Sequence, residues 1–161
     1  MSTVQGALTM QDWLATAAKA AEELTKGQLG YDEFEIGGPV TDAEVTDVGS
    51  YVALVGDEGS AQIGLIASIE GCRSLAKKML CMEDGEELED SDMCDAVGEM
   101  ANILGGATKR LISERVPGFK LGLPLFMQGR LLASDQQEVG MVEIRIGPVP
   151  AHLIVVRHKG E

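Results

Sequence analysis

Glu99 and Asn102 are the two residues of this chain whose types and spacing could do chemistry together. They lie three positions apart in a segment with helical periodicity, so their side chains leave one side of a helix. A carboxylate binds cations, and an amide donates and accepts hydrogen bonds without carrying charge. Asn102 is the only asparagine, and asparagine is a poor helix former. We therefore predict that this helix presents Glu99 and Asn102 to a partner.

The neighbours of the pair suggest a surface for that partner. Asp95, Gly98 and Gly106 lie around Glu99 and Asn102, and the two glycines lower the helix surface. Two alternatives remain open from the residues alone: the pair belongs to an ordinary solvated helix face, or the glycines pack the helix on a sheet. The opposite side of the helix carries an apolar stripe typical of a core contact, made of Met93, Val97, Met100, Leu104, Ala107 and Leu111.

The rest of the chain must position this helix. We expect Ser91 or Asp92 to be the N-cap of this helix, and we expect the helix to run to about Arg115 and to stop before Pro117. The other predicted helices span residues 10–25 and 70–82. The predicted strands span residues 31–40, 51–55, 61–67, 120–127, 139–146 and 152–157, with breaks at 147–148 and at Pro150. The strands at 51–55 and 61–67 flank residues 56–59, which predicts a hairpin with a four- or five-residue loop. Without a repeat or linker, residues 1–161 are predicted to be one α+β domain with helices packed on a mainly antiparallel sheet.

Composition excludes several classes of function. A net charge of −13 argues against nucleic-acid and anionic-membrane surfaces, and no apolar run reaches the roughly 20 residues of a membrane span. Residues 1–10 show no export signal, so we expect a cytoplasmic protein. Three cysteines and two histidines without paired spacing predict no metal site. Cys94 is read as a packed thiol and not as a nucleophile.

A longer pattern resembles a known family. Residues 98–105 read GEMANILG, and Leu121-Gly122-Leu123-Pro124 and Gly129 follow. This is similar to the CheC, CheX and FliY family of chemotaxis phosphatases, in which a helix with Glu-x-x-Asn precedes a strand of the type apolar-x-apolar-Pro. CheC-like members carry two such sites. The single asparagine, and the lack of a long N-terminal peptide or switch domain, favour a CheX-like protein.

The resemblance implies an activity and a partner. Family members dephosphorylate the phosphoaspartate of CheY, a response regulator that supplies its own Mg²⁺ and lysine. By this resemblance Asn102 positions the attacking water, Glu99 docks on the lysine, and the chain needs no cofactor of its own. It also implies a homodimer joined through a continuous sheet, for which the strand at 152–157 is either the edge or an ordinary core strand. The alternatives are a response-regulator-binding module without catalysis and a structural component of a signalling or flagellar complex.

Overall fold

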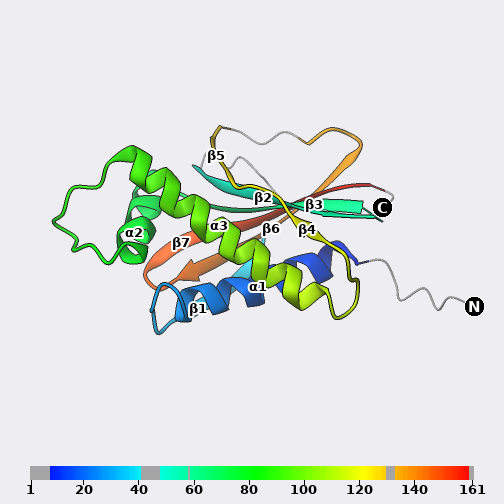
Figure 1. The fold of residues 1–161 in the computed structure, drawn as a ribbon, viewed down its shortest axis with the longest axis horizontal. Helices are drawn as coiled ribbons and strands as arrows, with labels where there is room; N and C mark the ends of the chain where they lie inside the picture. Colours follow the sequence, from blue (N-terminus) through cyan, green and yellow to red (C-terminus); the bar gives the residue numbers. More distant parts are fainter. Residues whose placement is uncertain (1–7, 41–47, 58, 130–132, 160–161) are drawn as a thin grey trace, which may run out of the picture.

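Seven antiparallel strands form one sheet, and three helices pack on one of its faces (Figure 1). The computed structural model describes residues 8–40, 48–57, 59–129 and 133–159. The first seven residues, which belong to the stretch without an export signal, and Glu58 in the predicted hairpin loop lie outside the described residues. The strand order is β1-β6-β7-β3-β2-β4, and β5 also pairs with β2. The predicted α+β class with a mainly antiparallel sheet is confirmed.

Helix α1, Met10–Lys26, starts at a capping box. The Thr9 hydroxyl accepts a hydrogen bond from the Asp12 backbone N–H at 3.1 Å, and the Asp12 carboxylate accepts one from the Thr9 N–H at 2.8 Å. This exchange satisfies two N–H groups that a bare helix end leaves without partners. The buried side of α1 is formed mostly by alanines, which let the helix lie close to the sheet; it consists of Trp13, Ala17, Ala18, Ala20, Ala21, Leu24 and Thr25.

The central hairpin is longer than its sequence pattern suggested. Strand β2, Val48–Gly56, pairs with β3, Gly59–Ala67, in an unbroken register from Val48 opposite Ala67 to Gly56 opposite Gly59. Alternate residues point toward the helices and form the main core, including Val52, Leu54, Ile63 and Leu65. The predicted hairpin is confirmed, but the predicted loop of four or five residues is too long, because pairing continues to Gly56 opposite Gly59.

Strand β7, Val149–His158, lies inside the sheet between β3 and β6, Gln137–Ile146. The suggestion that this segment forms a dimer edge is therefore wrong, and the core-strand alternative is right. The prediction of a break at Pro150 is also wrong. Pro150 pairs with Arg145 in β6, while the pairing with β3 begins only at His152. The missing N–H of proline therefore removes no hydrogen bond from the β3 side.

Helices α2, Ile69–Met79, and α3, Asp90–Ile112, follow the hairpin. Helix α2 ends three residues before the predicted Met82, because Cys81 adopts a left-handed conformation with φ of 56°. The N-cap of α3 is Glu89, two or three residues before the predicted Ser91 or Asp92, and the helix ends at Ile112, three residues before the predicted Arg115. Its stripe is buried as expected from Met93 to Leu104, but Thr108 and Ile112 replace Ala107 and Leu111 at the C-terminal end.

The two edges of the sheet differ. Strand β1, Phe34–Pro39, pairs with β6 at one edge. At the other edge, the single strand predicted for residues 120–127 is divided into β4, Lys120–Leu121, and β5, Leu125–Gln128. Both pair with β2, so this short, interrupted edge lies beside α3.

Candidate functional site

The exposed side of α3 carries the predicted pair. Glu99 is exposed, Asn102 is half-buried, and Asp95 is exposed one turn before Glu99. No described residue forms a hydrogen bond or an ion pair with the side chain of Glu99 or Asn102. Both side chains therefore keep their full hydrogen-bonding capacity toward the described part of the chain, which is what contact with a second molecule requires.

The glycines around the pair have different environments. A Cβ atom built on Gly106 would meet nothing within 4 Å, so Gly106 leaves open space next to Asn102. Gly98 is buried, and its Cβ would lie 3.8 Å from Pro124 Cγ. Gly98 thus brings the segment between β4 and β5 against the helix and offers little open surface of its own.

Gly105 is the glycine that the packing requires. A Cβ there would lie 2.6 Å from Val52 Cγ1 and 2.8 Å from Leu121 Cδ1, closer than real atoms approach. The packing role considered for the glycines therefore falls on Gly105. In the sequence Gly105 and Gly106 are adjacent and look alike. Which of the two faces the sheet depends on how the helix is rotated about its axis, and the sequence alone does not fix that rotation.

Ser50 is a polar residue beneath the site that the sequence interpretation missed. It is fully buried on β2, and no described residue forms a hydrogen bond with its hydroxyl. A Cβ on Gly98 would lie 3.9 Å from Ser50 Oγ, so the hydroxyl lies below the Gly98 contact. The available signal was a serine within an apolar strand, which alone indicates no function.

Helix α3 is supported from the side by α1. Arg110 forms an ion pair with Glu23, and Arg115, just beyond α3, forms one with Asp12 at 3.2 Å. Below these ion pairs the buried faces of the two helices share one core. The exposed turn with Glu99 and Asn102 therefore stands on a helix that is packed on both the sheet and α1, which holds its side chains in place.

Cys94 precedes Gly98 by about one turn and is partly buried. Burial, followed by the nearby carboxylates of Asp90 and Asp95, raises the pKa of its thiol. A raised pKa lowers the thiolate fraction at neutral pH, which disfavours nucleophilic chemistry. Among the described residues, no three His, Cys, Asp or Glu side chains form a group that could hold a metal ion. No described helix combines the length and apolar character needed to cross a membrane.

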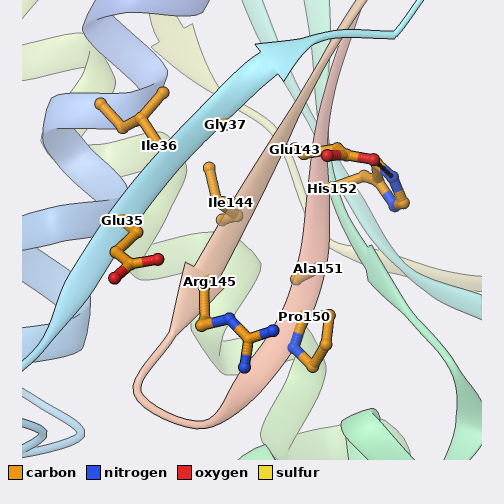
Figure 2. A pocket seen from close by; sticks show the side chains of 9 residues that line it. All are labelled: Glu35, Ile36, Gly37, Glu143, Ile144, Arg145, Pro150, Ala151 and His152. Carbon is orange, nitrogen blue, oxygen red and sulfur yellow. Dashed lines mark ion pairs between the residues drawn. The ribbon is translucent and has the colours of Figure 1, made fainter.

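A shallow pocket of about 240 Å³ lies elsewhere, between β1, β6 and β7 (Figure 2). Glu143 and His152 point toward one another at its edge, with 3.9 Å between Oε1 and Nε2. Its lining includes Glu35 and Arg145 but no serine, threonine or cysteine. The pocket therefore offers charged groups without a nucleophile, and the exposed side of α3 is the stronger candidate site.

The profile of the family described as chemotaxis phosphatase CheX matches residues 48–146, which is more than half of the chain. The chain belongs to the CheX family. The matched span includes α3 with Glu99 and Asn102, and it excludes α1, β1 and β7. No curated protein matches the chain.

Solved structures share the fold of this CheX-family chain at low sequence identity. CheX from Vibrio vulnificus superposes with a TM-score of 0.74 at 15% identity, covering 91% of this chain and 99% of that chain. A chain of the CheX–CheY–BeF3–Mg²⁺ complex from Borrelia burgdorferi has a TM-score of 0.70 at 20% identity, covering 92% and 99%. FliY from Thermotoga maritima superposes with a TM-score of 0.65 at 17% identity, covering 96% of this chain and 93% of that chain. These likenesses confirm the predicted CheC-like and CheX-like fold.

Proposed function

We propose that this chain hydrolyses the phosphoaspartate of a CheY-like response regulator. Membership of the chemotaxis phosphatase CheX family supports the activity. The complex of a similarly folded CheX with CheY, BeF3 and Mg²⁺ supports the class of partner. In this proposal the Mg²⁺ belongs to the regulator, and the chain contributes side chains only.

Asn102 is assigned to the attacking water. Hydrolysis of an acyl phosphate requires a water in line with the bond that breaks, so catalysis depends mainly on positioning and charge. A neutral amide can hold that water by donating one hydrogen bond and accepting another. A carboxylate at the same position would repel the phosphoryl oxygens. The half-buried setting of Asn102 limits the freedom of its side chain, which favours a positioning role.

Glu99 is assigned to docking. Its exposed carboxylate would form a charge-assisted hydrogen bond with the active-site lysine of the regulator. Glu99 and Asn102 are three residues apart on one helix, so both can enter the same small site. The open space at Gly106, and the exposed Asp95, belong to the surface that would face the regulator.

One observation carries the proposal: Glu99 and Asn102 share an exposed helix face, and no described residue engages either side chain. The test follows phosphate release from a phosphorylated CheY-like regulator with wild type, Asn102→Ala and Glu99→Ala. We expect Asn102→Ala to slow stimulated release by about 100-fold with little change in affinity. We expect Glu99→Ala to weaken binding as well as slow turnover.

The same assay separates the alternatives. A non-catalytic binding module would bind the regulator and leave phosphate release unchanged or slower, and a structural component would do neither. Unchanged release with Asn102→Ala would overturn the water-positioning role. Normal affinity of Glu99→Ala would overturn the docking role.

We also propose a homodimer joined at a sheet edge. Since β7 is internal, the candidate edge is β1, whose Ile36 is 59% exposed. An unpaired strand edge can pair with a second copy of itself. The Gly147 N–H bonds to the Glu33 carbonyl, so Glu33 and Glu35 face β6 and the N–H of Ile36 lies on the free side of β1. Ile36→Pro would remove that N–H, so a dimer measured by light scattering should become a monomer. A wild-type monomer at high concentration would overturn this proposal.

A further inference from the structure

The sheet edge beside α3 contains a β-bulge. Leu121 lies opposite Leu54, and Leu125 lies opposite Tyr51. Three residues separate Leu121 from Leu125, whereas two separate their partners in β2. The edge therefore carries one extra residue, and such a bulge changes the direction in which the following side chains point. In a regular strand, Leu121, Leu123 and Leu125 would share one face.

The bulged segment runs alongside the turn of α3 that carries Glu99 and Asn102. Leu121 lies against Gly105, and Pro124 lies against Gly98. Seven helical residues rise by about 10.5 Å, and three extended residues cover about 10 Å. Residues 121–124 therefore follow α3 from Gly105 back to Gly98, as the yellow segment leading to β5 does in Figure 1. Leu123, between the two contacts, lies level with the turn from Glu99 to Asn102.

Leu123 is held rigidly and yet points to solvent. It is 90% exposed, the highest value among the large exposed apolar residues described. On one side of it, the Gly122 N–H donates a hydrogen bond to the Ala53 carbonyl at 2.8 Å. On the other side, Pro124 packs at Gly98 and β5 pairs with β2. The exposure of Leu123 therefore comes from the register of a fixed backbone.

We propose that Leu123 is an apolar anchor for the same regulator, inserting into an apolar pocket next to its phosphoaspartate. This inference rests on the proposed function, because it places the anchor beside Glu99 and Asn102. A preformed apolar anchor adds affinity with little ordering cost. In this proposal Leu123 is a binding residue that raises the affinity for the regulator. The rate of hydrolysis in the bound complex depends on Asn102 and not on Leu123.

The experiment compares Leu123→Ser with Leu125→Ser. Leu125 is also exposed, at 60%, but it pairs with Tyr51 and points to the sheet face away from α3. Phosphate release is measured against the concentration of phosphorylated regulator, and binding is measured separately with regulator loaded with Mg²⁺ and BeF3. For Leu123→Ser we expect KM and Kd to rise about tenfold, with kcat within twofold of wild type. Leu125→Ser should behave like wild type, and Leu123→Met, which keeps an apolar side chain, should lose less affinity than Leu123→Ser.

Several results would overturn the anchor: an unchanged KM and Kd for Leu123→Ser, an equal loss for Leu125→Ser, or a fall in kcat alone. Failure of the proposed function looks different, because wild type itself would then not accelerate phosphate release. In that case the binding measurement still decides the anchor. Wild type that binds the BeF3-loaded regulator, with Leu123→Ser binding more weakly, supports the anchor; absence of binding by wild type overturns it.

Discussion

Val52 on β2 lies so close to Gly105 on α3 that a methyl group on Gly105 would come within 2.6 Å of Val52 Cγ1. This contact sets the distance between the helix and the strand. The adjacent Gly106 has no neighbour within 4 Å of the same test position. One residue therefore separates a position with no spare room from a position open to solvent, and both lie within about one turn of Asn102.

Gly105→Ala and Gly106→Ala should change stability in opposite directions. At Gly106 alanine has better helix propensity, so we expect the free energy of unfolding to rise by about 1 kcal/mol. At Gly105 the same gain is offset by overpacking against Val52 and Leu121, and we expect a net loss of about 1–2 kcal/mol. Urea denaturation of both variants measures the difference. Equal effects at the two positions would contradict the packing described for α3.

Asn102→Ala should stabilise the protein that it inactivates. Asn102 is half-buried in the middle of α3 without a hydrogen-bond partner among the described residues. Replacing it removes a poor helix former, so we expect a gain of about 0.5 kcal/mol in the free energy of unfolding. Thermal melting checks this next to the phosphate-release assay. A clear loss of stability would indicate a structural role for the amide.

Ser50→Ala should not destabilise the protein, although Ser50 is fully buried. Its hydroxyl has no partner among the described residues, and burial of an unpaired hydroxyl costs about 1–3 kcal/mol. We therefore expect Ser50→Ala to raise the free energy of unfolding by about 1 kcal/mol. Thr108→Val is the matched control, because the buried Thr108 hydroxyl donates to the Leu104 carbonyl at 2.7 Å. The free energy of unfolding of this control should fall by about 1 kcal/mol. A similar fall for Ser50→Ala would show that the Ser50 hydroxyl does have a hydrogen-bond partner.

Asp12→Asn should cost stability in a pH-dependent way. Hydrogen bonds from Thr9, backbone first, and the nearby Arg115 lower the pKa of Asp12 below its ordinary 3.8. A lowered folded-state pKa means that the ionised carboxylate stabilises the fold above pH 3.8 and that this contribution is lost as pH falls through the lower value. At pH 7 we expect the free energy of unfolding of Asp12→Asn to be about 1 kcal/mol lower than that of wild type. Urea titrations at pH 7 and pH 3 should show it shrinking, and a constant difference would refute the linkage.

The three thiols should react with a neutral alkylating reagent in the order Cys81, Cys94, Cys72. Cys81 is exposed, whereas Cys72 is buried with its Sγ directed at the Val48 carbonyl at 3.4 Å. Cys94 is intermediate in exposure, and burial with Asp90 and Asp95 raises its pKa. Its rate should therefore still climb as pH passes 9. Mass spectrometry of time points gives the order, and early labelling of Cys94 would disprove the packed-thiol assignment.

Strong periodicity made the helices and the hairpin predictable. Helix α1 was expected over residues 10–25 and spans Met10–Lys26. The stripe on α3 shows where periodicity loses accuracy. Its six positions average about 3.6 residues apart, so they stay on one side of a straight helix. At the C-terminal end Thr108 and Ile112 are nevertheless buried in place of Ala107 and Leu111, so the packing partners and not the stripe decide which side is covered there.

Features that depend on a partner strand could not be predicted. Leu121, Leu123 and Leu125 alternate smoothly in sequence, and the bulge appears only when they are aligned with β2. The location of β7 had a usable signal. The run Leu153–Val156 is buried on both faces, as expected for an internal strand and not for an edge. For the candidate site, the sequence suggested Glu99 and Asn102, while the burial of Ser50 and the close contact at Gly105 became visible only in the three-dimensional packing.

The place of β7 in the sheet bears on how this protein can be shortened. A fragment limited to residues 48–146, the span that the family profile matches, would lack α1, β1 and β7. Without β7 the hairpin of β2 and β3 would lose its link to β6, and without β1 as well β6 would be unpaired on both sides. Without α1 the flank of α3 would be left uncovered. We therefore expect residues 48–146 not to fold alone, and deletion variants should keep α1, β1 and β7 together with the matched span.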